Sequence, residues 1–441
     1  MRFVAWFALC TIAAALAGGK QPKNYKDREE YDAYNEVTKD FAAKNFSKAL
    51  ADLERWSEKY SDSEFKDDRQ MLYVQAYAGT NQMGKVLDST AVVLANDRFT
   101  SANSANVLRV LYAAMSAIRH IPDPSPQQLA VAAKAASLLE TYDTAPDGVT
   151  ATAWATTRSE RQAAARAALL YIALIPASRA VKANDCGGAE TAAMKAIQEF
   201  PESVQAAWLL ALANLCLAKT DEQKTSPALY ELARAAALEP VKGMVDAKWQ
   251  QTSIIPYAEK AYSQFHGADP QGFKDLKELA VQSALPPPGF AIKSASEIAR
   301  ENQDEFESKY PQLALWLKIK NALSGSDGER YFESDLKGAA VPELQGVLVE
   351  ALPECRPTEL RVAIRLPNNT QNPPAEIALK LQRPLKGKPE LGSEIHWTGV
   401  ASAFSKEPLL LIMDVEPSNV KNLTFSPCEL RPRSPSRAVS K

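Results

Sequence analysis

The sequence predicts an α+β multidomain protein, in which an all-α solenoid of helical hairpins precedes a small all-β barrel or sandwich domain. Three observations predict it. Two segments that end at prolines repeat one spacing of small and apolar residues, three prolines interrupt the helical pattern at residues 286–288, and apolar residues begin to alternate after Val341. With 441 residues, the chain is long enough for about three domains.

The repeated spacing precedes Pro201 and Pro240. The residues twelve, eight and five places before these prolines are Ala189, Ala193 and Ala196, and Ala228, Leu232 and Ala235. This register resembles the second half of a tetratricopeptide (TPR) repeat, a helix pair of about 34 residues with small residues where the helices touch. The resemblance implies a solenoid that binds partners and does not catalyse a reaction.

Helical periodicity covers most of residues 31–323. Ala49, Leu53 and Trp56 place the same register in the helix expected over 47–60. Residues 151–183 form one helix that ends before Pro176 or continues through it with a kink. Further helices are expected over 31–46, 67–94 with a turn at Gly84, 102–119, 125–142, 245–284, and 296–323 with a break near Pro311.

Alternating apolar residues predict short strands over 346–352, 360–366, 377–381, 394–400, 409–415 and 420–425. Five or six such strands fit a small barrel or a sandwich, and by strand count the barrel loosely resembles an OB fold. The expected domains are a signal peptide (1–17), a solenoid (18–289), a helical connector or cap (290–338), a β-rich domain (339–427) and a disordered basic tail (428–441).

The first residues have the layout of a secretory signal peptide. A basic start is followed by an apolar run and by small residues, which favours cleavage after Ala17 over an uncleaved anchor; acylation at Cys10 is disfavoured because bulky Leu9 precedes it. No later segment is expected to be long and apolar enough to cross a membrane. The alanine-rich repeats resemble those of bacterial proteins, so we expect an exported protein that is periplasmic or secreted and can associate with the cell envelope.

Four cysteines remain after this leader, an even number in a chain that matures in an oxidising compartment. The favoured pairs are Cys186 with Cys216 and Cys355 with Cys428, because each pair then stays within one structural unit. Four free buried thiols are the equal alternative, because sequence cannot show the Cα separations that a disulfide requires.

The leading functional expectation is a non-enzymatic scaffold that binds a protein or peptide on the inner, concave face of the solenoid, while the β domain docks a second partner or the envelope. In a TPR array this face is lined by the first helices, whose candidate contact residues here are Asn35, Lys39, Gln70, Gln205 and Asn214. No cofactor is expected. The net charge of -2 predicts no nucleic-acid partner, and Trp397 is expected to pack rather than stack on bases.

The alternative is a carbohydrate-binding, small-molecule-binding or hydrolytic activity in the β domain, recruited by the repeats. Glu394, His396 and Asp414 are the polar residues that could carry it, provided that neighbouring strands bring them within hydrogen-bond reach. The three histidines lack partners at metal-ligand spacing, so no metal site is expected.

Overall fold

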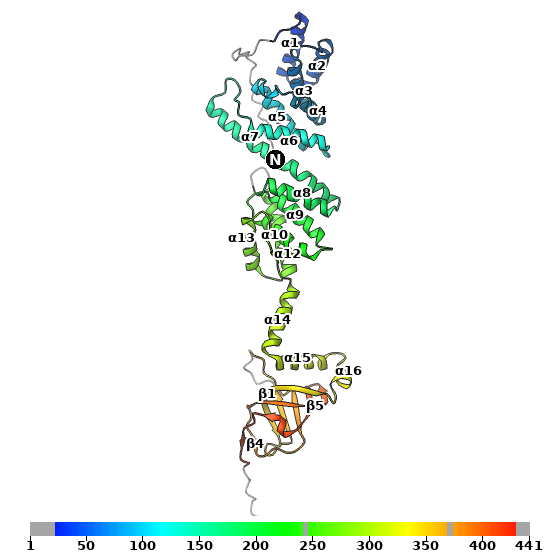
Figure 1. Cartoon of the computed structure of the whole chain (residues 1–441), viewed down its shortest axis with the longest axis vertical. Helices are drawn as coiled ribbons and strands as arrows, with labels where there is room; N and C mark the ends of the chain where they lie inside the picture. The colour runs from blue at the N-terminus through cyan, green and yellow to red at the C-terminus, as the bar shows by residue number, and fades with distance from the viewer. Residues whose placement is uncertain (1–22, 241–245, 368–373, 429–441) are drawn as a thin grey trace, which may run out of the picture. The chain divides into compact units, whose positions relative to one another are not determined.

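The computed structural model describes residues 23–240, 246–367 and 374–428 (Figure 1). The chain divides between Lys293 and Ser294 into a helical unit and a unit that contains the strands. The expected α+β layout is therefore confirmed. The expected signal peptide, and the tail beyond Cys428, lie outside the described residues.

The helical unit is a stack of antiparallel hairpins. Each helix from α1 to α9 packs on the next one along the chain, and α3, α5, α7 and α9 also contact one another in succession. The helices are α1 (Arg28–Ala42), α2 (Phe46–Lys59), α3 (Lys66–Gly79), α4 (Met83–Leu94), α5 (Ser104–Ala117), α6 (Pro126–Thr141), α7 (Ala151–Lys182), α8 (Cys186–Glu199), α9 (Val204–Leu217), α10 (Thr225–Ala237), α11 (Ala247–Trp249), α12 (Ile255–His266) and α13 (Pro270–Gln282).

Three hairpins share one turn. Lys44, Asn81 and Asn184 follow α1, α3 and α7, and they have φ angles of 57°, 59° and 56° in the left-handed region. In each turn the next amide donates to the carbonyl five residues earlier, at 2.8, 2.9 and 2.9 Å. This is the hydrogen bond of a Schellman helix end, so three hairpins turn by the same backbone geometry.

The small residues that define the repeated spacing are buried. Ala189 and Ala228 are 1% and 0% exposed, and the other members of the two sets are also enclosed. Alanine at these positions lets adjacent helix backbones approach closely. The expected apolar face of each second helix is thus confirmed, and α10 is buried on every side because α12 and α13 also pack on it.

Residues 151–183 form a single helix, α7, which continues through Pro176. By length and composition α7 could cross a membrane, so the expectation that no later segment has this capacity is wrong. In the structure α7 packs on α6 and α8, and Ala165, Ala168, Leu170 and Leu174 are buried there. A core helix of a helical stack passes the same length and hydropathy test.

The second unit contains a closed five-stranded barrel. Its strands pair in the ring β1–β2–β3–β6–β5–β1, in which β3 and β6 are parallel and the other pairs are antiparallel. The choice between barrel and sandwich is thereby settled, and the barrel is consistent with an OB-like domain. The strands are β1 (Ala340–Leu352), β2 (Glu359–Ala363), β3 (Ile377–Leu381), β4 (Lys388–Pro389), β5 (Glu394–Lys406), β6 (Leu409–Val415), β7 (Val420–Lys421) and β8 (Phe425–Ser426).

Two long strands close the barrel. β1 pairs with both β2 and β5, and its register shifts between Leu348 and Glu350 and between Val341 and Leu344. Gly346 allows the close approach of β2, because a Cβ there would lie 2.6 Å from Val362 Cγ1. The irregular pairing, and the lack of a side chain at Gly346, let β1 bend so that it pairs with both β2 and β5.

The helices that precede the barrel belong to its unit. They are α14 (Ala295–Lys309), α15 (Pro311–Ser324) and α16 (Gly328–Tyr331). The break at Pro311 is as expected, but α15 does more than connect: Trp316, Ile319 and Leu323 join the barrel core, and Trp316 Nε1 donates to Glu376 Oε2 at 2.8 Å. In Figure 1, α15 lies beside β1.

Candidate partner-binding surface

We call α1, α3, α5, α7 and α9 the first helices, because each opens a hairpin of the stack. The second helices α2, α4, α6, α8 and α10 alternate with them along the chain. Because consecutive first helices from α3 to α9 touch one another, they form one layer. A continuous layer of helices offers an extended surface to a bound chain.

Four of the five predicted contact residues are accessible. Asn35 and Lys39 are exposed and lie one turn apart on α1, so they share a face. Gln70 on α3 and Gln205 on α9 are half-buried. The prediction for Asn214 is wrong. This side chain is only 4% exposed, because α8 and α10 enclose α9, so Asn214 cannot contact a partner at the surface.

Aromatic residues extend this surface beside α9. The ring of Trp208 lies 6.0 Å from that of Trp249 and 5.3 Å from that of Tyr257, in edge-to-face contacts. Tyr257 is 43% exposed, and the two tryptophans are half-buried. Large aromatic side chains that are partly exposed to solvent are common anchors in protein interfaces. Trp208 lies on α9, and the other two rings come from α11 and α12, beyond α10 in the chain.

α10, which packs on α9, carries two buried charged residues, Arg234 and Glu231. Arg234 is 4% exposed and donates to the carbonyls of Pro201, Ala280 and Ser283, which lie at the ends of α8 and α13. One guanidinium therefore satisfies carbonyl groups at two helix ends. Sequence analysis did not identify this residue, whose only signal was a lone arginine in an apolar helix.

Glu231 is fully buried on the same helix. Within the described residues, neither of its carboxyl oxygens has a hydrogen-bond partner, nor does Asn214 Oδ1 on α9. Burial raises the pKa of Glu231 to about 8, and the charge of Arg234 opposes this rise. Glu231 is therefore mostly protonated at neutral pH.

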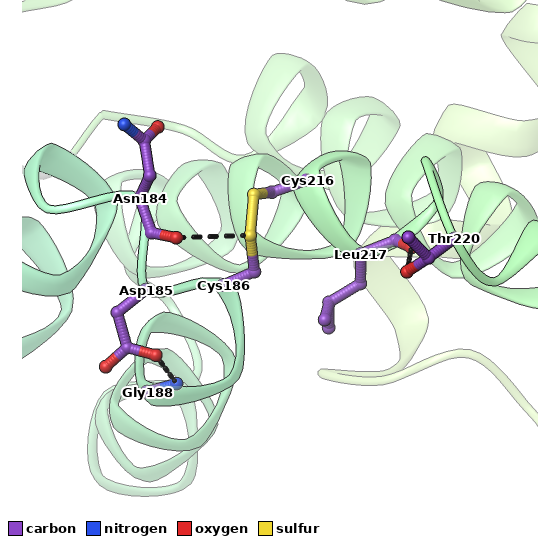
Figure 2. Close-up of a disulfide and its surroundings, with 7 residues drawn as sticks. All are labelled: Asn184, Asp185, Cys186, Gly188, Cys216, Leu217 and Thr220. Atoms are coloured by element: carbon purple, nitrogen blue, oxygen red, sulfur yellow. Dashed lines mark hydrogen bonds between the residues drawn. A yellow bond between two sulfur atoms is a disulfide. The ribbon is translucent and has the colours of Figure 1, made fainter.

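The four described cysteines form the two favoured pairs. Cys186, at the start of α8, is joined to Cys216 near the end of α9, with a Cα separation of 5.7 Å (Figure 2). Cys355 is joined to Cys428 at a Cα separation of 5.8 Å. Both separations lie in the usual range for disulfides. In the turn beside Cys186, the Asp185 carboxylate accepts a bond from the Gly188 amide, which caps α8.

The polar residues proposed for an activity in the β domain do not converge. Glu394 accepts a hydrogen bond from Gln345, and Asp414 accepts one from Ser402. His396 Nδ1 lies 3.5 Å from Glu343 Oε1. Asp414 is the partner of Val400 across the β5–β6 ladder, which is six residues, or about 20 Å, along β5 from Glu394. The barrel does not build a shared site from these three side chains.

Trp397 packs inside the barrel. It is 0% exposed and belongs to the barrel core, as expected. Among the described residues, no group of three or more histidine, cysteine or acidic side chains is arranged to hold a metal ion.

The sequence matches no protein-family model and no curated protein.

Proposed function

We propose that this protein is an exported, non-enzymatic scaffold of the TPR type, which binds a peptide or protein segment on its layer of first helices. The observation that carries the proposal is the regular hairpin stack, in which three hairpins share a left-handed turn and the second helices bury small residues. Repeated hairpins of this kind serve mainly to present an extended binding surface. The accessible side chains of Asn35, Lys39, Gln70 and Gln205 are the candidate contacts on this layer, and Tyr257 of α12 adjoins it through its ring contact with Trp208.

Export is supported by the cysteines. Disulfides persist in the periplasm and outside the cell, and thiols in the cytosol are kept reduced. The pairing of all four described cysteines fits a protein that folds in an oxidising compartment. A periplasmic or secreted location is therefore part of the proposal.

The barrel is proposed to dock a second partner or the cell envelope. Its OB-like closure supports a binding role, since barrels of this class use their outer strands and loops to hold ligands. The enzymatic alternative lacks a site shared by Glu394, His396 and Asp414, because Asp414 pairs with Val400, about 20 Å along β5 from Glu394.

Affinity capture from a cell-envelope extract, followed by mass spectrometry, tests the proposal. We would compare the natural chain with a surface variant that changes two first-helix residues and the exposed tyrosine of α12 (Lys39→Ala, Gln205→Ala, Tyr257→Ala). A control on the second helices (Glu58→Ala, Lys195→Ala, Gln198→Ala) alters exposed residues of α2 and α8. The proposal expects proteins that the natural chain and the control retain and the surface variant loses. Equal retention by both variants, or no specific capture, would contradict it.

A further inference from the structure

Basic residues outnumber acidic ones on α5, on the turn after it and on α7. No acidic residue occurs in α5 or α9, and Glu160 is the single one in α7. By contrast, α1 alone carries five acidic residues. The basic residues of α5, the turn after it and α7 are Arg109, Arg119, Arg158, Arg161, Arg166, Arg179 and Lys182. This concentration is local, because the whole chain has a net charge of -2.

Three of these arginines are neutralised within the protein. Arg158 pairs with Asp143 at 2.7 Å, and Arg166 pairs with Glu202 at 2.8 Å. Arg179 pairs with Asp123. Their charges are therefore already balanced by the loops and helix ends around α7.

Three other arginines have no acidic partner within the described chain: Arg109, Arg119 and Arg161. Arg109 donates to Asn106 Oδ1 at 3.2 Å, and Arg119 donates to the Ala167 carbonyl at 3.4 Å. Arg161 is half-buried, its guanidinium lies 5.9 Å from the ring centroid of Trp154, and its buried Nη1 has no hydrogen-bond partner among the described residues. A guanidinium that is partly desolvated and lacks an acidic partner favours the approach of an anion.

These arginines are interleaved with exposed tyrosines. Arg109, Tyr112 and Arg119 recur at three- and seven-residue steps, which places them on one face of α5 and its last turn. The Arg119 guanidinium lies 5.3 Å from the ring centroid of Tyr171 on α7, and α5 contacts α7, the helix that carries Arg161. Tyr112 is 50% exposed and Tyr171 is 37% exposed. We call these five residues the arginine–tyrosine strip.

We infer that the arginine–tyrosine strip is the docking site for an acidic peptide segment of a partner protein. This inference rests on the proposed binding role of the first helices and names the chemistry of the partner. Arginine binds carboxylates through two parallel N–H donors, and arginine and tyrosine are enriched where proteins meet. Arg109 to Arg119 spans ten residues of helix, or about 15 Å, which matches four or five residues of an extended peptide.

A peptide explains the strip better than a nucleic acid does. The strip contains no lysine, and its tyrosines give a partner apolar area as well as charge. A nucleic-acid surface normally carries a wider basic field than three unpaired arginines. Binding of a nucleic acid instead of a peptide is one of the outcomes that the test distinguishes.

The test is fluorescence anisotropy with the full chain and a labelled ten-residue peptide that carries four glutamates and two leucines. The strip variant is Arg109→Gln, Arg119→Gln, Arg161→Gln. The matched control, Arg158→Gln, Arg166→Gln, Arg179→Gln, removes the same charge from α7, where each arginine already has an acidic partner. We expect the Kd of the peptide to rise about tenfold or more in the strip variant and less than about twofold in the control.

A second variant guards against misfolding. Arg109→Gln, Arg119→Gln changes only exposed residues, so it should fold normally by circular dichroism and still weaken binding about threefold. The inference is overturned if the peptide does not bind saturably, if both triple variants lose binding equally, or if a single-stranded oligonucleotide of equal charge binds as tightly. If the peptide fails while envelope capture still depends on Lys39, Gln205 and Tyr257, the strip inference falls and the scaffold proposal stands.

Discussion

The helical unit and the barrel unit bury their cores in different ways. The helical unit has several successive apolar clusters, each built largely from helices that are neighbours in sequence. The barrel unit has one cluster that gathers residues from Trp316 to Val420. Within the described residues, all the fully buried polar and charged side chains belong to the helical unit. The stack is therefore held by local contacts and a few enclosed polar and charged groups, whereas the barrel depends on one apolar core that gathers residues from α15 to β7.

Trp316→Ala should produce the largest difference between the two units. Trp316 is 1% exposed in the barrel core, so its truncation should destabilise the barrel by about 4 kcal/mol. Hydrogen exchange followed by mass spectrometry would show lost protection in the strands and none in α1–α10. As a control, Trp316→Phe keeps most of the packing and loses the bond to Glu376, at a cost of about 1 kcal/mol. Equal loss in both variants would show that packing of α15 is not the cause.

Glu231→Gln should alter the pH dependence of the helical unit. The pKa of Glu231 is about 8 in the folded chain and 4.5 in its ordinary state, so between these values the folded state holds a proton that the unfolded state has released. The free energy of unfolding must then fall as pH rises, by about 3 kcal/mol from pH 5 to pH 8. The glutamine variant should be more stable at pH 8 and should have a flatter profile.

Urea titrations of the helical unit at pH 5, 6, 7 and 8 would measure this profile. The exposed Glu259→Gln on α12 serves as the matched control and should leave the slope unchanged. A Glu231 variant with the slope of the natural chain would show that this carboxyl group is ionised, and therefore solvated, when the chain is folded.

Lys44→Gly should have the smallest effect, and, unlike the Trp316 variants, it should stabilise the chain. Lys44 occupies the left-handed region, which is costly for a residue with a Cβ and open to glycine. The glycine variant should raise the free energy of unfolding of the helical unit, measured by urea titration, by about 0.5–1 kcal/mol. Lys44→Ala removes the charge but keeps the backbone cost, so it should be neutral. If the two variants are equally stable, the shared turn is not strained at this position.

Much of the fold was accessible from sequence because it follows from local patterns. Alternation placed β3 and β6 at their observed bounds, and the spacing before Pro201 and Pro240 identified the buried faces of α8 and α10. Strand neighbours could not be predicted, since the pairing of β3 with β6 joins segments far apart in the chain. The role of α15 in the barrel core was missed for the same reason.

The candidate surface was less predictable than the fold. Asn35 and Lys39 are accessible as expected, but Asn214 is buried because α9 is covered by helices on both sides. The arginine–tyrosine strip was not visible, since the acidic partners of the other arginines come from loops and helices elsewhere in the sequence. A count of charges cannot separate paired arginines from unpaired ones.

The bridge between Cys186 and Cys216 also bears on how the stack responds to mechanical load. A pulling force along the backbone would pass through the sulfur atoms and bypass the 30-residue interval that contains α8 and α9. About 100 Å of contour length is thereby withheld from extension. While the cysteines stay oxidised, a scaffold stretched between two attachments would lengthen elsewhere first.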